Sequence, residues 1–492
     1  MGVGHPPRVR RNSLKEACGV VAAHSERGSN VVPKLLRSLE ALQHRGQESW
    51  GFAVPGRPVF RRLGLVAEWR DYEDEVAGYT GSTGIGHVRY STKGRTSVNN
   101  AHPIQIGEEF SIAHNGTIAN AEGLAVSVSQ GVGKVSCESD TRVVGLRLLQ
   151  LLENGDDWFS AFEKLGKEII GAYCFAILNR QGEAIAARDP RGYRPLSLGW
   201  HERSSTYIVA SESCALAAVE AELVRDIEPG EMVVMGSRGK FESFRFAPKM
   251  DTAFCSFEYA YFAHPASRVN GVSVYETRKS VGKILAKRLR VNGDVIVPVP
   301  DSARPAALGF SLASGIPMDE GLMKDRYKRR GSIRSFIEPR QESREEVVKQ
   351  IIPIREAVDG KDVIVVDDSV VRGTSARTLI RSLRRSGART VKMAVTFPPI
   401  RHPCKMGVDF PTREELLAHR VAEDEAEPEE LAAKVGSALD AEEFYYNDIA
   451  GMAEAIGIPK DKLCFACVDG DYSKLETLLQ VQKAEERRTI DS

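Results

Sequence analysis

The sequence has no long apolar run, and none of its apolar stretches approaches the roughly 18 residues that a membrane span needs. Residues 1–17 contain basic side chains but not the apolar core of a secretory signal. An excess of charge is also absent, because 67 Lys and Arg balance 67 Asp and Glu. Without a long-range field, neither nucleic acid nor an anionic membrane is indicated as a partner. We therefore expect a cytoplasmic protein that binds neither.

Cysteine is scarce, with eight residues in 492 at uneven spacing. That number is too small for a disulfide framework at this length. In a reducing compartment the remaining roles for a special cysteine are nucleophile and metal ligand. The length and the 42% hydrophobic composition allow two or three domains with sizeable cores.

The stretch 363–375, VIVVDDSVVRGTS, predicts a buried strand that ends in Asp367 and Asp368 and is followed by a short loop and a helix. Open parallel sheets bind their ligands at this end of their strands. The loop adds hydroxyls and backbone N–H groups at a helix N-terminus, which favours anions. The two acids would repel a phosphate, so they suit sugar hydroxyls or a divalent metal. The alternative is a core strand whose acids cap the next helix.

This stretch resembles the binding motif of phosphoribosyltransferases, which hold phosphoribosyl pyrophosphate (PRPP). The resemblance implies that Asp367 and Asp368 bind the ribose hydroxyls. The strand, turn and helix pattern of 294–315, by itself a plain βα connection, resembles the pyrophosphate loop of that family. Ser302 would then share a Mg²⁺ site with the acidic pair, since this hard cation takes oxygen ligands. The other residues that the resemblance assigns to PRPP are Asp301, Ser369, Arg372, Gly373 and Thr374.

The segment 321–346 is polar and dense in Arg and Lys. Such a run is commonly a solvated face, but between two phosphate-binding segments a basic loop could close over a diphosphate. The phosphoribosyltransferase resemblance implies a lid here that includes Lys324, Arg326 and Tyr327. The pattern departs from the family at Asp325, where asparagine is usual, and by extra residues in the KRRGSIRSF region.

Cys18 begins the stretch CGVVAAHS, whose small and β-branched residues predict a short buried strand. A buried, inert cysteine is the ordinary alternative for such a position. Polar segments between apolar strands follow it, and Gly-flanked polar loops at strand ends are where a β-rich scaffold places its chemistry. These segments are LQHRGQESWGFAV (42–54), GHVRYSTKG (86–94), AHNGTIAN (113–120) and SDTRVV (139–144).

In the same order, these segments resemble the glutamine amidotransferases of the N-terminal-nucleophile class. The resemblance implies that residues 1–17 are a propeptide and that Cys18 is the nucleophile, with its own α-amine as general base. An α-amine has a pKa of about 7.7–8.0, which suits that role near neutrality. Arg89 would bind the glutamine carboxylate and Asp140 its amine. Asn115 and Gly116 would form the oxyanion hole. Taken singly, these residues also fit a salt bridge, a helix cap and a tight turn.

Both resemblances together imply a fold of mixed α+β and α/β class. We expect an αββα-sandwich glutaminase domain over 18–245 and a type I phosphoribosyltransferase α/β domain with a parallel sheet over 255–470. A C-terminal helix and tail would occupy 471–492.

The pair Cys464 and Cys467 stands in a Cys-x2-Cys spacing that fits zinc, redox or cluster chemistry, and the spacing alone does not choose among them. The segments around Cys255, Cys404 and CFACVDGDY resemble the iron–sulfur branch of the glutamine PRPP amidotransferases. That resemblance implies a [4Fe–4S] cluster on these four cysteines, with a structural rather than catalytic role.

The resemblance covers nearly all of 18–480 and implies one reaction. Glutamine is hydrolysed at Cys18 through a thioester, and ammonia passes internally to PRPP, where it displaces pyrophosphate and gives 5-phosphoribosylamine for purine synthesis. A homo-oligomer, tetramer or dimer, and purine nucleotide effectors are implied as well. Two alternatives stay open: a glutamine–fructose-6-phosphate aminotransferase, whose second half would need tandem sugar-isomerase domains, and a degenerate paralogue that binds PRPP or nucleotides as a regulator.

Overall fold

A computed structural model describes residues 18–90, 97–132, 139–237, 240–324, 351–408, 410, 412–424 and 426–475. Within these ranges the chain forms two compact units. The sandwich unit contains the chain from Cys18 to Thr277, the segment around Cys404 and the chain from Ile456 onward. The parallel-sheet unit contains Arg278–His402 and the chain from Phe410 to Ala455. No helix in the described ranges is long and apolar enough to cross a membrane.

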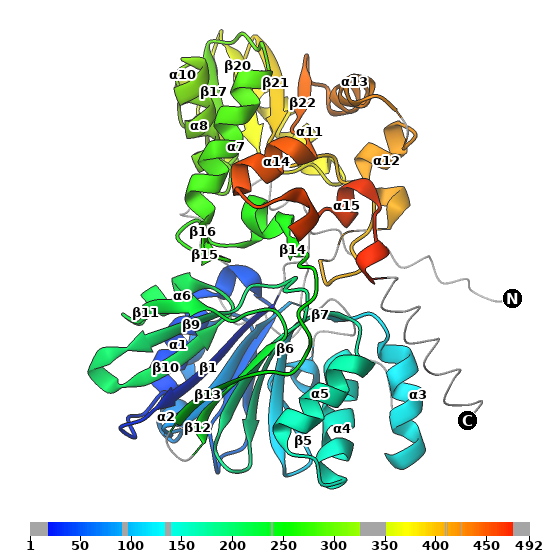
Figure 1. The fold of residues 1–492 in the computed structure, drawn as a ribbon. Coiled ribbons are helices and arrows are strands. Elements are labelled where there is room, and N and C mark those ends of the chain that lie inside the picture. Colours follow the sequence, from blue (N-terminus) through cyan, green and yellow to red (C-terminus); the bar gives the residue numbers. More distant parts are fainter. Residues whose placement is uncertain are drawn as a thin grey trace, which may run out of the picture. The chain divides into compact units, whose positions relative to one another are not determined.

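Two antiparallel sheets form the sandwich unit (Figure 1). The seven-stranded sheet has the order β11-β9-β10-β1-β4-β2-β3. Its strands are β1 (Gly19–Ser25), β2 (Ser49–Ala53), β3 (Phe60–Leu63), β4 (Thr83–Arg89), β9 (Ser197–His201), β10 (Thr206–Ala210) and β11 (Glu222–Asp226). The six-stranded sheet has the order β13-β12-β8-β7-β6-β5. Its strands are β5 (Ile104–Ile106), β6 (Phe110–Ile118), β7 (Gly171–Asn179), β8 (Ala184–Arg188), β12 (Glu231–Ser237) and β13 (Lys240–Arg245).

Helices cover the outer face of each sheet. The seven-stranded sheet packs on α1 (Val32–Ala41) and α6 (Ser213–Ala217), with α2 (Glu73–Ala77) beside them. The six-stranded sheet packs on α3 (Ala121–Val132), α4 (Asp140–Glu153) and α5 (Trp158–Glu168), which run together along one side of it in Figure 1. These four layers confirm the expected αββα sandwich.

The sandwich follows from strands that are apolar on both faces. In β1, Val21 and Ala23 face the helices, whereas Val20 and Ala22 join the core between the two sheets. In β7 the same alternation sends Phe175 to the outer core and its neighbours inward. Because side chains alternate along a strand, a continuous apolar run buries both faces. The start of β1 is therefore fixed from both sides.

The parallel-sheet unit contains a four-stranded sheet in which all described neighbours are parallel. Its order is β17 (Val295–Pro298), β20 (Asp362–Asp367), β21 (Thr390–Val395) and β22 (Phe444–Tyr446). Met318 adds an isolated parallel bridge to Ile296 at the β17 edge. The helices are α7 (Val274–Arg288), which begins in the sandwich unit, α8 (Arg304–Ser314), α10 (Arg355–Val358), α11 (Thr374–Arg385), α12 (Leu417–Val421), α13 (Pro428–Leu439) and α14 (Ile449–Ile456).

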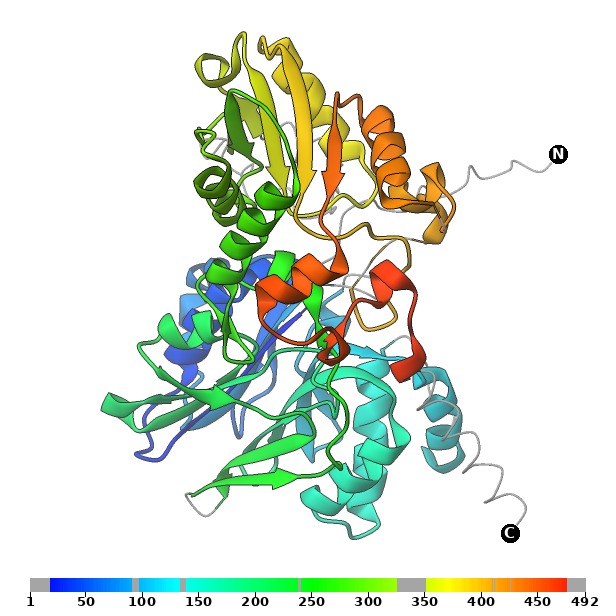
Figure 2. The same ribbon diagram turned by 45° about the horizontal axis from the view of Figure 1, so that its top comes forward.

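Helices lie on both faces of this sheet, as both views show (Figure 2). In β20, Val363 and Val365 pack on the side of α11 and α13, and Ile364 and Val366 on the side of α7 and α8. The run VIVV is therefore a central strand covered twice, as the sequence indicates. Such a sheet exposes functional groups only at its strand ends.

Short elements complete the fold. In the parallel-sheet unit, β18 (Leu322–Lys324) pairs with β19 (Ile351–Pro353). In the sandwich unit, β15 (Arg268–Val269) pairs with β16 (Val272–Ser273), and β14 (Phe254–Cys255) pairs in parallel with β23 (Leu463–Cys464) before α15 (Ala466–Asp469). Contacts thus assign the chain from 255 to 277 and the C-terminal segment to the sandwich unit. The domain limits drawn from the sequence at 245, 255 and 470 stay predictions.

Two glycines let α7 and α8 approach closely. A Cβ on Gly282 would lie 1.8 Å from the carbonyl oxygen of Ala306, and one on Gly309 would lie 1.9 Å from that of Lys279. Neither distance is tolerable, and the atoms in the way are backbone. Glycine in a helix interior is normally unfavourable, so here close packing decides its presence.

Gly309→Ala should therefore lower the free energy of unfolding by about 1–3 kcal/mol, because the helices must separate to admit the methyl group. The matched control is Gly123→Ala in α3, where the added Cβ meets no atom within 4 Å. This control should raise stability by about 0.5–1 kcal/mol through helix propensity. Urea unfolding measures both changes, and equal effects would contradict the packing argument.

Candidate active sites

Cys18 lies directly before β1, and Gly19 pairs with Val88 on β4, so the cysteine reaches the end of β4 at Arg89. Its Sγ donates a hydrogen bond to the carbonyl oxygen of Tyr90 at 3.4 Å. Burial raises the pKa of the Cys18 thiol, and the positive charge of Arg89 opposes this rise. The thiol therefore stays protonated near neutrality. A reaction at this sulfur needs a base.

Gly46 allows the turn after η1 (Gln43–Arg45) to lie against this site. A Cβ at Gly46 would come within 2.7 Å of the backbone of Arg89. The segment QHRG, quoted above only as a polar stretch, thus contacts the strand end that carries Arg89.

Asn115 and Gly116 lie on β6 of the other sheet, and Ser211 connects Asn115 to Val20, two residues after Cys18. The Ser211 hydroxyl accepts from the amide of Val20 at 2.9 Å and from Asn115 Nδ2 at 3.5 Å. Gly116 has φ +142°, and a Cβ there would lie 1.9 Å from the carbonyl oxygen of Ala172. Only glycine fits this position. Ser211 was not predicted from the sequence, because a lone serine gives no signal of such a contact.

Asp140 begins α4, where Ser139 caps the helix by accepting from the amide of Arg142. One Asp140 oxygen accepts from the amide of Ile118 at 3.1 Å, and the other accepts from the amide of Thr141 at 2.8 Å. The carboxylate is thereby held two residues beyond Gly116 on β6. Its charge acts on the Cys18 thiol together with that of Arg89. The structure thus brings together all the predicted glutamine-site residues.

Three buried histidines lie behind these groups and were not anticipated. The rings of His87 and His102 are 4.5 Å apart, and His87 Nε2 is 3.0 Å from the carbonyl oxygen of His114. His114 Nδ1 is 3.1 Å from the Thr141 hydroxyl, next to Asp140. Burial lowers the pKa of His87 to about 3 and lowers those of His102 and His114. At neutral pH the three rings are uncharged, so they do not repel Arg89, whose charge acts on His87 and His102.

In the parallel-sheet unit, Asp367 and Asp368 lie at the C-terminal end of β20. Asp368 is 6% exposed and accepts hydrogen bonds from Ser302 at 2.5 Å and from Ser369 at 2.8 Å. Burial raises the pKa of Asp367, and the charge of Asp368 raises it further. Burial likewise raises the pKa of Asp368. Two buried acids of this kind are stabilised by a cation or by hydroxyl donors.

The loop from Ser369 to Thr374 leads from this pair into α11. Gly373 has φ +82°, and a Cβ there would lie 2.6 Å from Leu417 Cδ2, so glycine is needed for the turn. Arg372 donates to Glu415 at 3.1 Å. Its Nε and Nη1 are buried and have no hydrogen-bond partner within the described residues. These two N–H donors are available to an anion.

Asp301 and Ser302 follow β17, whose C-terminal end lies beside that of β20. Lys324, the last residue of β18, donates to Asp301 at 2.9 Å. Lys324, the first predicted lid residue, therefore contacts the predicted pyrophosphate loop, and Ser302 of that loop is bonded to Asp368 of the acidic pair. Arg326 and Tyr327 lie outside the described residues.

The four predicted cluster cysteines all belong to the sandwich unit. Cys255 and Cys464 are register partners in the β14–β23 pair, and Cys404 Sγ accepts from the amide of Met406 at 3.2 Å. Burial raises the pKa of Cys255 to about 11 and raises those of Cys464 and Cys467, and the thiols of the group raise these pKa values further. All four are free thiols. They form one cysteine group: Cys255, Cys404, Cys464 and Cys467.

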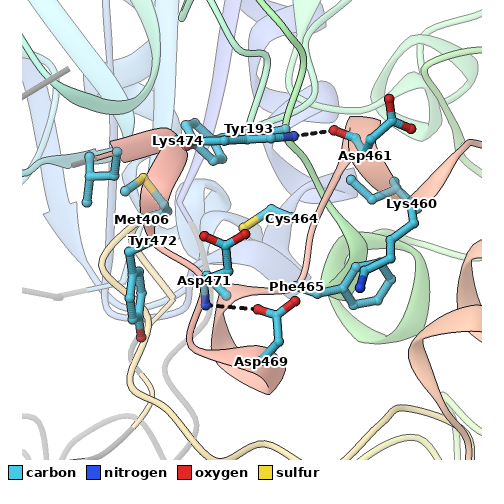
Figure 3. A pocket seen from close by; sticks show the side chains of 14 residues that line it. Tyr193, Met406, Lys460, Asp461, Cys464, Phe465, Asp469, Asp471, Tyr472 and Lys474 are labelled. Carbon is cyan, nitrogen blue, oxygen red and sulfur yellow. Dashed lines mark hydrogen bonds between the residues drawn. The ribbon is translucent and has the colours of Figure 1, made fainter. Parts of the chain in front are cut away.

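A cavity of about 390 Å³ lies beside this group and is lined by Cys464, Tyr193 and Met406 among others (Figure 3). Lys474 closes one side by donating to the carbonyl oxygen of Asp461. Across the described ranges, no set of three or more His, Cys, Asp or Glu side chains is arranged to hold a single metal ion. A four-iron cluster binds each cysteine sulfur through a different iron, which spaces the sulfurs more widely than one ion does.

The fold and the two sites define a class: an N-terminal-nucleophile glutamine amidotransferase joined to a phosphoribosyltransferase-type parallel sheet. The family model "Glutamine amidotransferase domain" matches residues 87–218. Amidophosphoribosyltransferases from Methanocaldococcus jannaschii and Mycobacterium tuberculosis are 37% and 38% identical. These alignments cover 92% and 95% of this chain and 97% and 88% of the relatives. The chain belongs to the amidophosphoribosyltransferase family.

A solved structure of glutamine PRPP amidotransferase from B. subtilis, complexed with ADP and GMP, has a TM-score of 0.79 at 34% identity. The similarity covers 92% of this chain and 97% of that one. A structure described as the allosteric regulatory enzyme of purine biosynthesis has the same TM-score at 35% identity, with 92% and 96% covered. The similarity thus extends through both halves, which disfavours a sugar-isomerase second half.

The activity is therefore the transfer of glutamine-derived ammonia to PRPP, which gives 5-phosphoribosylamine, pyrophosphate and glutamate. This reaction is the first committed step of de novo purine biosynthesis.

Proposed function

We propose that the sandwich unit hydrolyses glutamine at Cys18 and that the strand ends around Asp367 and Asp368 bind PRPP. The observation that carries this assignment is the place of Cys18: it directly precedes a strand that is covered on both faces, and the charges of Arg89 and Asp140 act on its thiol. A thiol with a raised pKa reacts only when a base removes its proton. The α-amine of Cys18 supplies that base once residues 1–17 are removed.

Arg89 then pairs with the glutamine α-carboxylate and Asp140 with its α-amine. The three neutral histidines are compatible with this role, because they add no positive charge that would repel Arg89. The Asn115 side chain carries two N–H donors, of which one is directed to Ser211. The second, with the Gly116 amide, stabilises the oxygen of the tetrahedral intermediate.

At the second site Mg²⁺ fits the donor set of Ser302, Asp367 and Asp368. All three side chains offer oxygen ligands, and the raised pKa values indicate that the site favours added positive charge. The loop residues Ser369, Gly373 and Thr374 bind the 5-phosphate at the start of α11, and Arg372 contributes its two unpaired donors. Asp301 and Lys324 lie by the pyrophosphate. The lid role of Arg326 and Tyr327 stays a prediction from the sequence, because both residues lie outside the described ranges.

For the cysteine group we propose a [4Fe–4S] cluster. Four free cysteines in three segments of one unit, two of them register partners in the β14–β23 pair, fit the ligand set of such a cluster. Iron would stabilise the thiolates that burial disfavours. Its role is to connect the C-terminal segment to β14.

The proposal also includes effectors, an oligomeric state and a cellular location. Purine nucleotides act as effectors, as the complex of the B. subtilis relative with ADP and GMP suggests by analogy. The protein works in the cytoplasm as a homo-oligomer, a tetramer or a dimer.

Cys18→Ala should abolish glutamine-dependent release of pyrophosphate and leave ammonia-dependent release within about twofold, because the two half-reactions use separate sites. Pyrophosphate release from PRPP and Mg²⁺ measures both. The intact mass of the purified wild-type chain must show the loss of residues 1–17. Loss of both activities in a folded variant would contradict the two-site assignment, and binding of PRPP without turnover in the wild type would favour the regulator.

Asp368→Asn should weaken PRPP binding about 10- to 100-fold, because one of the two charges that attract the metal is removed. Calorimetric titration with PRPP and Mg²⁺ measures this effect independently of glutamine. The matched control is Asp362→Asn at the opposite end of β20, where the carboxylate pairs with Arg389 at 2.7 Å. It should leave PRPP affinity unchanged. Equal affinity in both variants would overturn the metal site.

Protein purified without oxygen should contain roughly four irons and four sulfides per chain. Cys464→Ser should lose this iron, whereas Cys214→Ser, a buried cysteine outside the group, should retain it. Stoichiometric zinc in place of iron would refute the cluster.

A further inference from the structure

A cluster of four buried charges lies in the sandwich unit and has no part in the chemistry above. Arg45, whose side chain is fully buried, donates to Glu212 at 2.5 Å and to both oxygens of Glu258 at 3.0 and 2.8 Å. Glu258 also accepts from Arg194 at 3.0 Å. The other three side chains are at most 1% exposed. We call these four residues the buried charge network.

The network contains two guanidinium groups and two carboxylates, and His44 Nε2 also lies 2.8 Å from Glu212. Burying a charge without a partner would be strongly unfavourable, and even paired charges lose hydration. Hydrophobic residues of similar volume would stabilise such a core at least as well. We therefore explain the network by the groups that it positions rather than by any stability that it adds to the fold.

One end of the network reaches the nucleophile. Arg45 Nε donates to the carbonyl oxygen of Cys18 at 3.1 Å. The ladder of β1 starts only at Gly19. The carbonyl carbon, the α-amine and the Cβ that carries the thiol are all bonded to the Cα of Cys18. A fixed carbonyl therefore restricts the directions in which the amine and the thiol can point.

The other end reaches the cysteine group. Glu258 begins the π-helical turn η5 (Glu258–Phe262), three residues after Cys255. Arg194 Nη2 donates to the carbonyl oxygen of Met406 at 2.9 Å, and the Met406 amide donates to Cys404 Sγ. Two of the three segments that carry the cysteine group are thus bonded directly to the network.

We propose that Arg45 is a positioning residue for Cys18. Glu258, in the segment of Cys255, holds Arg45 in place, and Arg194 connects Glu258 to the segment of Cys404. The order of the cysteine group then sets the geometry of the glutaminase nucleophile. This inference rests on the proposed role of Cys18 and adds to it a route through named side chains, Cys404–Met406–Arg194–Glu258–Arg45–Cys18.

Arg45→Lys tests the near end. Lysine keeps the charge, but its single nitrogen cannot replace the four hydrogen bonds that the three guanidinium nitrogens make to Cys18, Glu212 and Glu258. Because misplacement of a reacting group by about 1 Å can cost roughly 100-fold in rate, glutamine-dependent kcat should fall about 10- to 100-fold. KM for glutamine should change far less, since Arg89 and Asp140 are intact. Ammonia-dependent activity should stay unchanged.

Labelling of Cys18 by 6-diazo-5-oxo-norleucine, an electrophilic glutamine analogue, gives a readout separate from turnover. Its rate should fall in parallel with kcat. The matched control is Arg225→Lys, which alters a two-bond pair with Glu231 elsewhere in the same unit. This control should label at the wild-type rate. Wild-type labelling in a folded Arg45→Lys would overturn the inference while the proposed function stands. The proposed function is tested separately, and it fails if Cys18→Ala keeps glutamine-dependent activity.

Cys404→Ser, singly and together with Arg45→Lys, tests the far end. The single variant should slow labelling, and the double variant should be little slower than Arg45→Lys alone, since the two changes act on one route. Where Cys404→Ser does not fold, Arg194→Lys takes its place in the cycle. Independent, multiplicative effects on the labelling rate would overturn the connection to the cysteine group.

Discussion

The position of Cys18 depends on a strand that is buried on both faces. The inner side chains of β1 fill the core between the sheets, and its outer ones pack under α1. A strand held in this way cannot slide, because a slip of one residue would exchange its two faces. The start of β1 is therefore a fixed point. Arg89, Asn115 and Asp140 reach it from three other elements of the unit.

The two sites share a second constraint. In each, burial disfavours the charged form of the key side chains, which are the Cys18 thiol and the two aspartates. Burial keeps the Cys18 thiol protonated and raises the pKa of the Asp367–Asp368 pair. Each site therefore favours its own partner: a base for the thiol, and a cation or sugar hydroxyls for the acids. The low-dielectric surroundings of each site therefore contribute to the choice of binding partner as much as the residues themselves do.

The family resemblance was sufficient for the αββα sandwich, and the continuous motif VIVVDD was sufficient for the doubly covered strand and the acidic pair at its end. The buried charge network was not predictable in this way. Arg45 and Glu258 are 213 residues apart in the sequence. Nothing next to either residue in the sequence distinguishes it from an ordinary surface charge. The histidines at 87, 102 and 114 likewise meet only after β4 and β6 are placed. Pairing across such separations is decided by topology rather than by local pattern.

The parallel pairing of Cys255 with Cys464 has a consequence for the synthesis of the protein chain on the ribosome. The ribosome must add 209 further residues after the first of these cysteines before the second exists, which takes roughly 10–40 s at 5–20 residues per second. During that interval β14 has no strand partner from the C-terminal segment, and the nascent chain carries an incomplete set of thiols. The sandwich unit, although it begins at Cys18, is thus among the last parts of the chain to be completed.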